Sequence, residues 1–203
     1  MNSQWGGINW PNDSDTLMNH LARFNGVDHV AICEIGIDEG KTGNRLVEFL
    51  KECGVKTVEY YGIDNLSYKA ITGKNQEIKF DYTEMNFIHG DKEEIQDLKP
   101  LDFALISACQ CAECTFQDSV ATSKRIKIGG SMAFHNTSLK IQYPNLKSEN
   151  KWQHYDSGKP LRPLNVVEGI LMARNLWEGA WVLLQQTGDE LDWGGIRIYQ
   201  RIA

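Results

Sequence analysis

The chain has 203 residues, of which 41% are hydrophobic and 24% charged, and this length suffices for one domain with a buried core. Its formal net charge of −6 disfavours nucleic acid as the main partner, because nucleic acids are bound through clustered cations. Apolar runs such as Trp181–Leu184 are too short to span a bilayer, which argues against a membrane protein.

Residues 1–26 are expected to form an irregular arm followed by a short helix. Met1–Trp10 lacks the basic start and the apolar stretch of a secretory signal. The five cysteines are an odd number, which fits a reducing compartment better than a disulfide framework. We therefore expect a cytoplasmic protein. Asp13 or Ser14 is expected to cap the helix, which is predicted over Asp15–Phe24.

From residue 27 onward, apolar runs typical of strands alternate with amphipathic segments typical of helices. The predicted strands are Val27–Ile35, Thr57–Ile63, Met85–His89, Leu101–Ala108, Ser131–His135 (after a turn at Gly129-Gly130), Ala180–Gln186 and Gly195–Arg201. The predicted helices are Thr42–Cys53, one within Leu66–Tyr82, Lys92–Leu98, Cys114–Ile126 and Asn165–Leu176. This alternation predicts a single α/β domain over residues 1–203, with a doubly wound, Rossmann-like, mostly parallel sheet of seven strands. A hairpin at Asp189–Gly194 joins the last two strands directly, so the last strand is expected to be antiparallel.

The segment 138–163 is polar, interrupted by prolines and rich in aromatic residues. Long loops in compact domains usually act as lids or binding loops. We expect this loop, together with the N-terminal arm, to cover a bound substrate. Oligomer contacts would have the same composition, so a homo-oligomer stays open.

The turn Glu34-Ile-Gly36-Ile-Asp-Glu-Gly40 lies after the first predicted strand, where ligands bind in doubly wound sheets. A P-loop would need a glycine five residues before Gly40, where Ile35 stands, and the carboxylates of Asp38 and Glu39 would repel phosphates. A dinucleotide fingerprint would need a third glycine and another spacing. A tight turn with a structural role alone stays open. The sulfonium and ammonium groups of S-adenosylmethionine (SAM) suit an acidic turn, and Asp64, after the second predicted strand, suits its ribose hydroxyls.

In this order, these residues resemble the motifs of class I SAM-dependent methyltransferases. The resemblance extends from about Val27 to Arg201 and includes Gly90-Asp91 and the strand Asp102–Ala108. It implies that SAM is the methyl donor and S-adenosylhomocysteine (SAH) the product. It places Glu34, Gly36 and Gly40 at the methionine end of SAM. It places Asp64 at the ribose and Asp91 at the adenine. The residues expected to bind the cofactor are Glu34, Gly36, Gly40, Thr42, Asp64, Asn65, Gly90, Asp91 and Ser107.

Within that superfamily, residues 105–138 resemble the small O-methyltransferases of the macrocin type and their cephalosporin-hydroxylase-like relatives. That branch carries metal-binding carboxylates where this chain has Ser107 and Asn136, and an acidic residue or a histidine where it has Cys109. Because Mg²⁺ prefers carboxylate oxygens, we expect no divalent metal. His135 is the candidate general base, since it follows a strand at its carboxyl end and the unperturbed histidine pKa is near neutrality. Asn136 is the candidate hydrogen-bonding partner of a substrate hydroxyl, and a structural role for both residues stays open.

Three cysteines, Cys109, Cys111 and Cys114, form a C-x-C-x-x-C pattern. This spacing is not a standard zinc half-site, and a fourth ligand would have to come from elsewhere, such as His135. We therefore interpret them as reduced, partly buried thiols.

The sequence thus predicts a SAM-dependent methyltransferase that acts on an oxygen of a small hydroxylated acceptor. Two alternatives stay open. One is a cephalosporin-hydroxylase-like enzyme of the same fold, which metal and 2-oxoacid dependence would identify. The other is a SAM- or nucleotide-binding module without catalysis, which SAM binding without turnover would identify.

Overall fold

The computed structural model describes residues 11–37, 40–64, 84–89, 94–108, 112–137, 166–188 and 194–203. Four predicted features lie wholly or largely outside these ranges: the N-terminal arm, the helix within 66–82, the loop 138–163 and the hairpin at 189–194.

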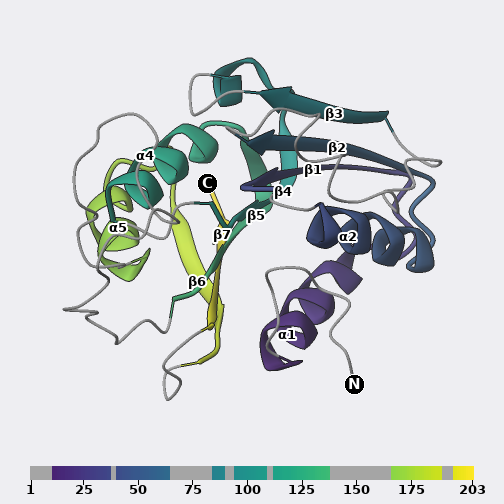
Figure 1. Cartoon of the computed structure of the whole chain (residues 1–203), viewed down its shortest axis with the longest axis horizontal. Coiled ribbons are helices and arrows are strands. Elements are labelled where there is room, and N and C mark those ends of the chain that lie inside the picture. The colour runs from purple at the N-terminus through teal and green to yellow at the C-terminus, as the bar shows by residue number, and fades with distance from the viewer. Residues whose placement is uncertain are drawn as a thin grey trace, which may run out of the picture.

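Seven strands form one sheet in the order β3-β2-β1-β4-β5-β7-β6 (Figure 1). The pairs β1–β2, β1–β4, β2–β3 and β4–β5 are parallel, and β7 is antiparallel to both β5 and β6. The prediction of a mostly parallel sheet with an antiparallel last strand is therefore confirmed. The strands are β1 His29–Ile35, β2 Thr57–Asp64, β3 Glu84–His89, β4 Leu101–Ile106, β5 Ile126–His135, β6 Trp181–Gln186 and β7 Ile196–Arg201.

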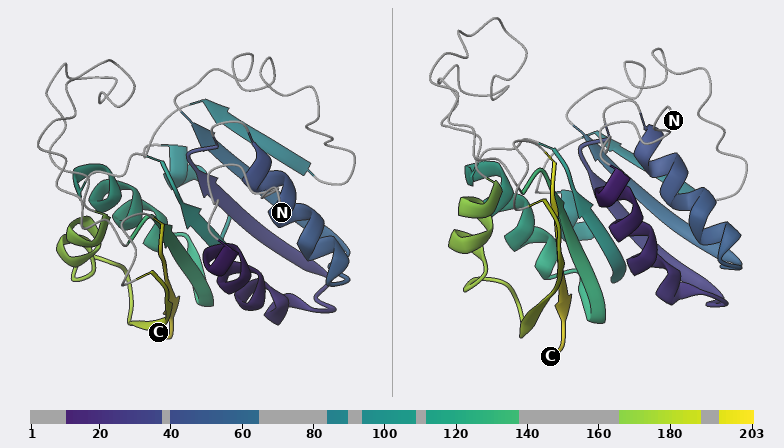
Figure 2. Two further views of the ribbon diagram at one scale, coloured as in Figure 1. Left: turned by 60° about the horizontal axis from the view of Figure 1, so that its bottom comes forward. Right: turned by 90° about the horizontal axis from the view of Figure 1, so that it is seen from below.

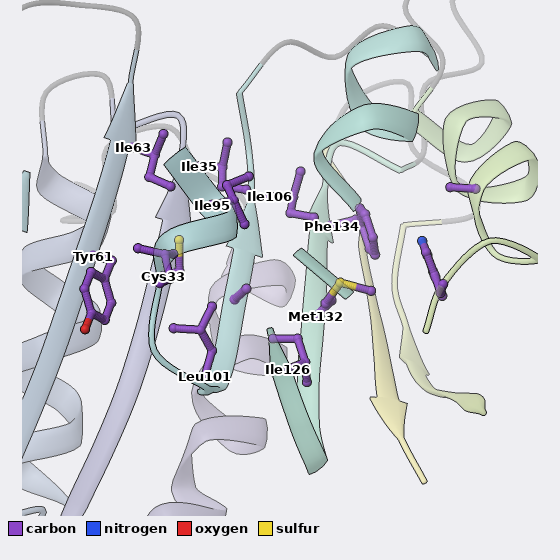
Figure 3. Close-up of a cluster of buried hydrophobic side chains, with 14 of the residues drawn as sticks. Cys33, Ile35, Tyr61, Ile63, Ile95, Leu101, Ile106, Ile126, Met132 and Phe134 are labelled. Atoms are coloured by element: carbon purple, nitrogen blue, oxygen red, sulfur yellow. The ribbon is translucent and has the colours of Figure 1, made fainter. Parts of the chain in front are cut away.

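Helices cover both faces of the sheet, with α1 and α2 on one face and α4 and α5 on the other, as Figure 2 shows. The buried strands contribute to a core on each side, which explains why they are apolar without alternation. In β1, Val30 and Ile32 pack on the α1–α2 side, whereas Ala31, Cys33 and Ile35 belong to the α4–α5 side shown in Figure 3. The helical elements are α1 Pro11–Leu21, η1 Ala22–Phe24, α2 Lys41–Glu52, η2 Glu94–Asp97, α4 Ala112–Ser123 and α5 Val166–Ala173. Among the described residues, no helix has the length and apolarity that a membrane span requires.

Two local predictions are wrong. Asp13 and Ser14 do not cap the first helix, because both lie inside α1, which begins at Pro11. Gly129-Gly130 do not turn into the fifth strand, because β5 runs through them. Between its pairs with Leu101 and Phe103 the register of β5 against β4 shifts, so this part of β5 is a bulge.

Candidate functional site

Four parallel strands, β2, β1, β4 and β5, end together at one edge of the sheet. Ile35 of β1 lies beside Ile63 of β2 and Ile106 of β4, and Ile106 lies beside Phe134 of β5. The residues that follow these positions share the carboxyl edge, where ligands of doubly wound sheets bind. The predicted site residues among them are Gly36, Asp64, Ser107 and His135.

Gly36 brings the predicted turn into direct contact with the segment after β4. Its N–H donates to the carbonyl oxygen of Ile63 at 2.9 Å, and the N–H of Ser107 donates to that of Ile35 at 2.9 Å. The φ of Gly36 is +88°, and a Cβ added there would lie 2.4 Å from Cα of Ala108. Only glycine fits this turn, because it tolerates both the backbone conformation and the close approach.

Asp64 is bound to the same turn. Its Oδ2 accepts a hydrogen bond of 2.8 Å from the N–H of Ile37, and the carbonyl oxygen of Ile37 accepts one of 2.8 Å from Gly40. Gly40 precedes α2, whose first turn contains the buried Thr42. Gly36, Gly40 and Asp64 therefore belong to one hydrogen-bonded unit at the carboxyl edge.

Glu34 lies beneath this unit rather than on its surface. Its side chain is only 1% exposed, and it accepts a hydrogen bond of 2.5 Å from the hydroxyl of Tyr60. A Cβ added to Gly43 of α2 would lie 2.6 Å from Oε2 of Glu34, so helix and carboxylate are tightly packed. Burial and the neighbouring carboxylate raise the pKa of Tyr60 well above its usual value. Glu34 thus supports the turn from inside the sheet, and its predicted contact with a ligand stays a prediction.

Replacing Tyr60 with phenylalanine should lower the free energy of unfolding by about 1.5–3 kcal/mol, because a buried carboxylate loses a hydrogen-bond donor. Urea unfolding of the variant measures this loss. Tyr61→Phe is the matched control: the Tyr61 hydroxyl donates to Glu59, which also accepts a hydrogen bond of 2.7 Å from Lys99. Its loss should be smaller, and a larger loss for Tyr61→Phe would contradict this interpretation.

At the end of β5, His135 is 3% exposed, and its burial lowers its pKa to about 4. Its Nδ1 lies 3.4 Å from Oγ of the half-buried Ser107, and its Nε2 lies 4.0 Å from Oδ2 of Asp13. Asn136 is also buried and has a φ of +61°, in the left-handed region that asparagine tolerates better than most residues. His135 is therefore a neutral imidazole at physiological pH, and the roles of His135 and Asn136 toward a substrate stay predictions.

The sequence analysis missed the part that Asp13 plays at this site. Its fully buried carboxylate accepts hydrogen bonds from Oγ1 of Thr187 at 2.6 Å and from N of Gly195 at 2.7 Å. The spacing contained a signal. Asp13, Leu17 and Leu21 are four residues apart and therefore lie on one face of a helix, so a carboxylate on an apolar stripe indicated a buried acid.

Several predicted site residues lie outside the described residues: Asn65, Gly90, Asp91, Cys109 and Cys111. Cys114 lies in α4. Among the residues that the structure describes, no group of three or more histidine, cysteine or acidic side chains could hold a metal ion. The expectations about metals and about the cysteine cluster stay predictions.

Solved structures of similar fold are methyltransferases. A magnesium protoporphyrin IX methyltransferase from Synechocystis PCC 6803 with bound SAH has a TM-score of 0.61 and 13% identity, over 92% of this chain and 80% of that one. An O-methyltransferase from Bacillus cereus in complex with SAH has a TM-score of 0.58 and 16% identity, over 95% and 82%. An rRNA methylase from Streptococcus thermophilus has a TM-score of 0.58 and 10% identity, over 94% and 97%.

No protein-family model matches the sequence, and no curated protein does. At 10–16% identity, the three structures show the fold of this chain and nothing finer. The residues that the structure describes have the Rossmann-like fold of these methyltransferases.

Proposed function

We propose that this protein is a SAM-dependent methyltransferase that acts on an oxygen of a small hydroxylated acceptor. The observation that carries the proposal is the hydrogen bond between Asp64 and Ile37, which joins the carboxylate at the end of β2 to the glycine turn after β1. The likeness to SAH-bound methyltransferase structures supports the same ligand class.

The residues at the carboxyl edge fit SAM chemically. A carboxylate such as Asp64 accepts hydrogen bonds from the two hydroxyls of a ribose. Gly36 has no side chain, and Ala108 packs into the space that a Cβ would fill, so the turn after β1 and the segment after β4 lie together at this edge. Asp38 and Glu39 of this turn are acidic, and one cation, Lys41, follows them, which suits a positively charged sulfur better than a phosphate. We place the methionine end of SAM at this turn and the adenine near Asp91.

The acceptor is placed at the end of β5, beside Ser107, His135 and Asn136. When bound, SAM supplies a methyl group that its sulfonium already activates. The protein must then align the acceptor oxygen with that methyl group and remove one proton. The neutral His135 has a free lone pair for this proton, which favours a hydroxyl acceptor that needs deprotonation. SAH is the second product.

Calorimetry with SAM and SAH tests the cofactor assignment. Asp64→Ala should weaken binding of both compounds at least tenfold, because it removes the ribose acceptor and the hydrogen bond to Ile37. Asp64→Asn should bind with intermediate affinity, since its amide oxygen can still accept from Ile37.

Asp28→Ala is the control for this measurement. Asp28 is an exposed carboxylate that precedes β1, at the opposite edge of the sheet, where it pairs with Lys56. Its removal should leave the affinity unchanged. A wild-type protein that binds neither SAM nor SAH would refute the proposed function.

A further inference from the structure

A buried carboxylate from the N-terminal helix reaches the end of β5. Both oxygens of Asp13 are held in place, Oδ1 by the hydroxyl of Thr187 after β6 and Oδ2 by the N–H of Gly195 before β7. Thr187 is itself held in place by Ile196. The N–H of Thr187 donates to the carbonyl oxygen of Ile196, and the N–H of Ile196 donates to the hydroxyl oxygen of Thr187. The carboxylate is therefore fixed in position before any ligand binds.

The imidazole of His135 lies between this carboxylate and a hydroxyl. Nε2 faces Oδ2 of Asp13 at 4.0 Å, and Nδ1 faces Oγ of Ser107 at 3.4 Å. Nε2 is fully buried and has no hydrogen-bond partner among the residues that the structure describes. A buried polar nitrogen without a hydrogen-bond partner lowers the stability of the folded protein, so its presence indicates a role in function. Catalytic hydrogen bonds are often this long without substrate and shorten when the complex forms.

The charges of the pair favour the arrival of one proton. Burial raises the pKa of Asp13, although Thr187 and Gly195 oppose that shift, and burial lowers the pKa of His135. Both oxygens of Asp13 accept hydrogen bonds, as those of an ionised carboxylate do, and the imidazole of His135 is neutral, so the pair carries one negative charge. A proton taken up by His135 forms an imidazolium beside that carboxylate, and the attraction between the two charges opposes the desolvation that lowers the pKa of His135.

We infer that Ser107, His135 and Asp13 form a proton relay for the acceptor hydroxyl, with Asp13 as the positioning residue. This inference rests on the proposed function. Nε2–H of His135 points at Asp13, so the lone pair of Nδ1 faces Ser107. Asp13 thus selects the tautomer that can accept a proton from the serine hydroxyl.

The step is balanced as follows. The acceptor O–H gives its proton to Oγ of Ser107 while Ser107 gives its own proton to Nδ1 of His135. The acceptor oxygen forms its bond to the methyl carbon as the carbon–sulfur bond breaks, and the electrons of that bond stay on sulfur. After the products leave, His135 returns the proton through Ser107 to solvent.

The first test is the tautomer of His135, read from ¹⁵N chemical shifts of the histidine side chains in the wild-type protein with SAH, and assigned with His135→Gln. We expect the Nε2–H tautomer at pH 7. In Asp13→Asn the Nε2–H tautomer of His135 should no longer predominate. A wild-type His135 that carries its proton on Nδ1 would overturn the relay.

The second test is turnover of the phenols and alcohols that the wild type methylates. Ser107→Ala and His135→Gln should each lower kcat about 100-fold, and Asp13→Asn about tenfold or more. In His135→Gln and Asp13→Asn, the acceptor KM and the SAM affinity should stay nearly unchanged. The Ser107→Ala/His135→Gln double variant should be no slower than the slower single variant, because the residues act as a unit.

His20→Gln is the matched control for the loss of a buried histidine. His20 is 6% exposed, and its Nε2 bonds Oγ of Ser131, four residues before His135 on β5. Its removal should leave kcat unchanged. Unchanged kcat in Ser107→Ala would refute the relay while the proposed function stands. A wild-type protein that does not bind SAH would refute the proposed function instead.

Discussion

Replacing Gly36 with alanine should lower the free energy of unfolding by about 2–6 kcal/mol and abolish SAM binding, through backbone strain together with overpacking. The new Cβ would lie 2.4 Å from Cα of Ala108 and 2.6 Å from its N. These are backbone atoms of the segment that follows β4, so no side-chain rotation can relieve the contact. Either the turn moves away from Asp64 or β4 shifts, and both changes displace the proposed ribose site. Urea unfolding and calorimetry with SAM measure the two effects.

Gly26→Ala separates the strain of the backbone from the close contact. Gly26 has a φ of +72°, close to the +88° of Gly36, but an added Cβ there would meet nothing within 4 Å. This control should cost only the conformational strain, about 1–2 kcal/mol, and should leave SAM affinity intact. If both variants lose the same stability, the contact with Ala108 has no energetic weight. If Gly36→Ala binds SAM normally, the turn does not approach the ligand.

The strands were predictable because burial on both faces leaves a simple sequence signal. Along β4 every residue from Phe103 to Ile106 is buried, so the run is apolar without alternation. The end of α2 was equally clear, because Gly54 follows the last apolar residue of its stripe. The antiparallel β7 followed from the hairpin-like spacing of the last two strands. The order of the strands in the sheet agrees with the order that the resemblance to methyltransferases implied. Hydrophobic periodicity alone does not give this order.

The carboxyl-edge residues were predictable in position but not in contact. Strand–turn boundaries placed Gly36, Asp64 and His135 at one edge, as the structure does. The bond between Asp64 and Ile37 depends on the path of the turn, which no residue pattern specifies. The burial of Glu34 beneath α2 was missed for a similar reason, because it depends on the packing of Gly43 and Tyr60 against it.

The partners of Asp13 were not predictable from local rules, although its spacing from Leu17 and Leu21 indicated a buried acid. An aspartate near a helix start is read first as a cap, because short polar side chains favour that position. Its partners Thr187 and Gly195 are 174 and 182 residues away in the chain. They become neighbours only because α1 packs against the strand pair β5–β7. The register of β5 was likewise hidden, since the bulge at Gly129-Gly130 has the sequence of an ordinary turn.

Acidification from pH 7 to pH 5 should lower the free energy of unfolding by roughly 4 kcal/mol, about 2 kcal/mol for each of two buried histidines. Burial, with Arg23 nearby, lowers the pKa of His20 to about 4, and burial alone lowers that of His135 to about 4, from 6.5 in both cases. Between pH 6.5 and 4 the unfolded chain therefore binds more protons than the folded one, so stability falls as pH falls. Asp13 faces His135 and acts in the opposite sense, because its raised pKa lets the folded state bind a proton more readily.

The two histidines can be separated because they lie in different surroundings. His20 bonds to Ser131 in the middle of β5, whereas His135 faces Asp13 at its carboxyl end. His20→Gln and His135→Gln should each remove about half of the difference in unfolding free energy between pH 7 and pH 5, as measured by urea unfolding. Equal stability of the wild type at both pH values would show that neither imidazole is buried as described. A variant that keeps the full pH dependence would exclude its own histidine as the cause. The same measurement bears on the relay, because a His135 that charges readily in the resting protein would already hold the proton that the acceptor must give up.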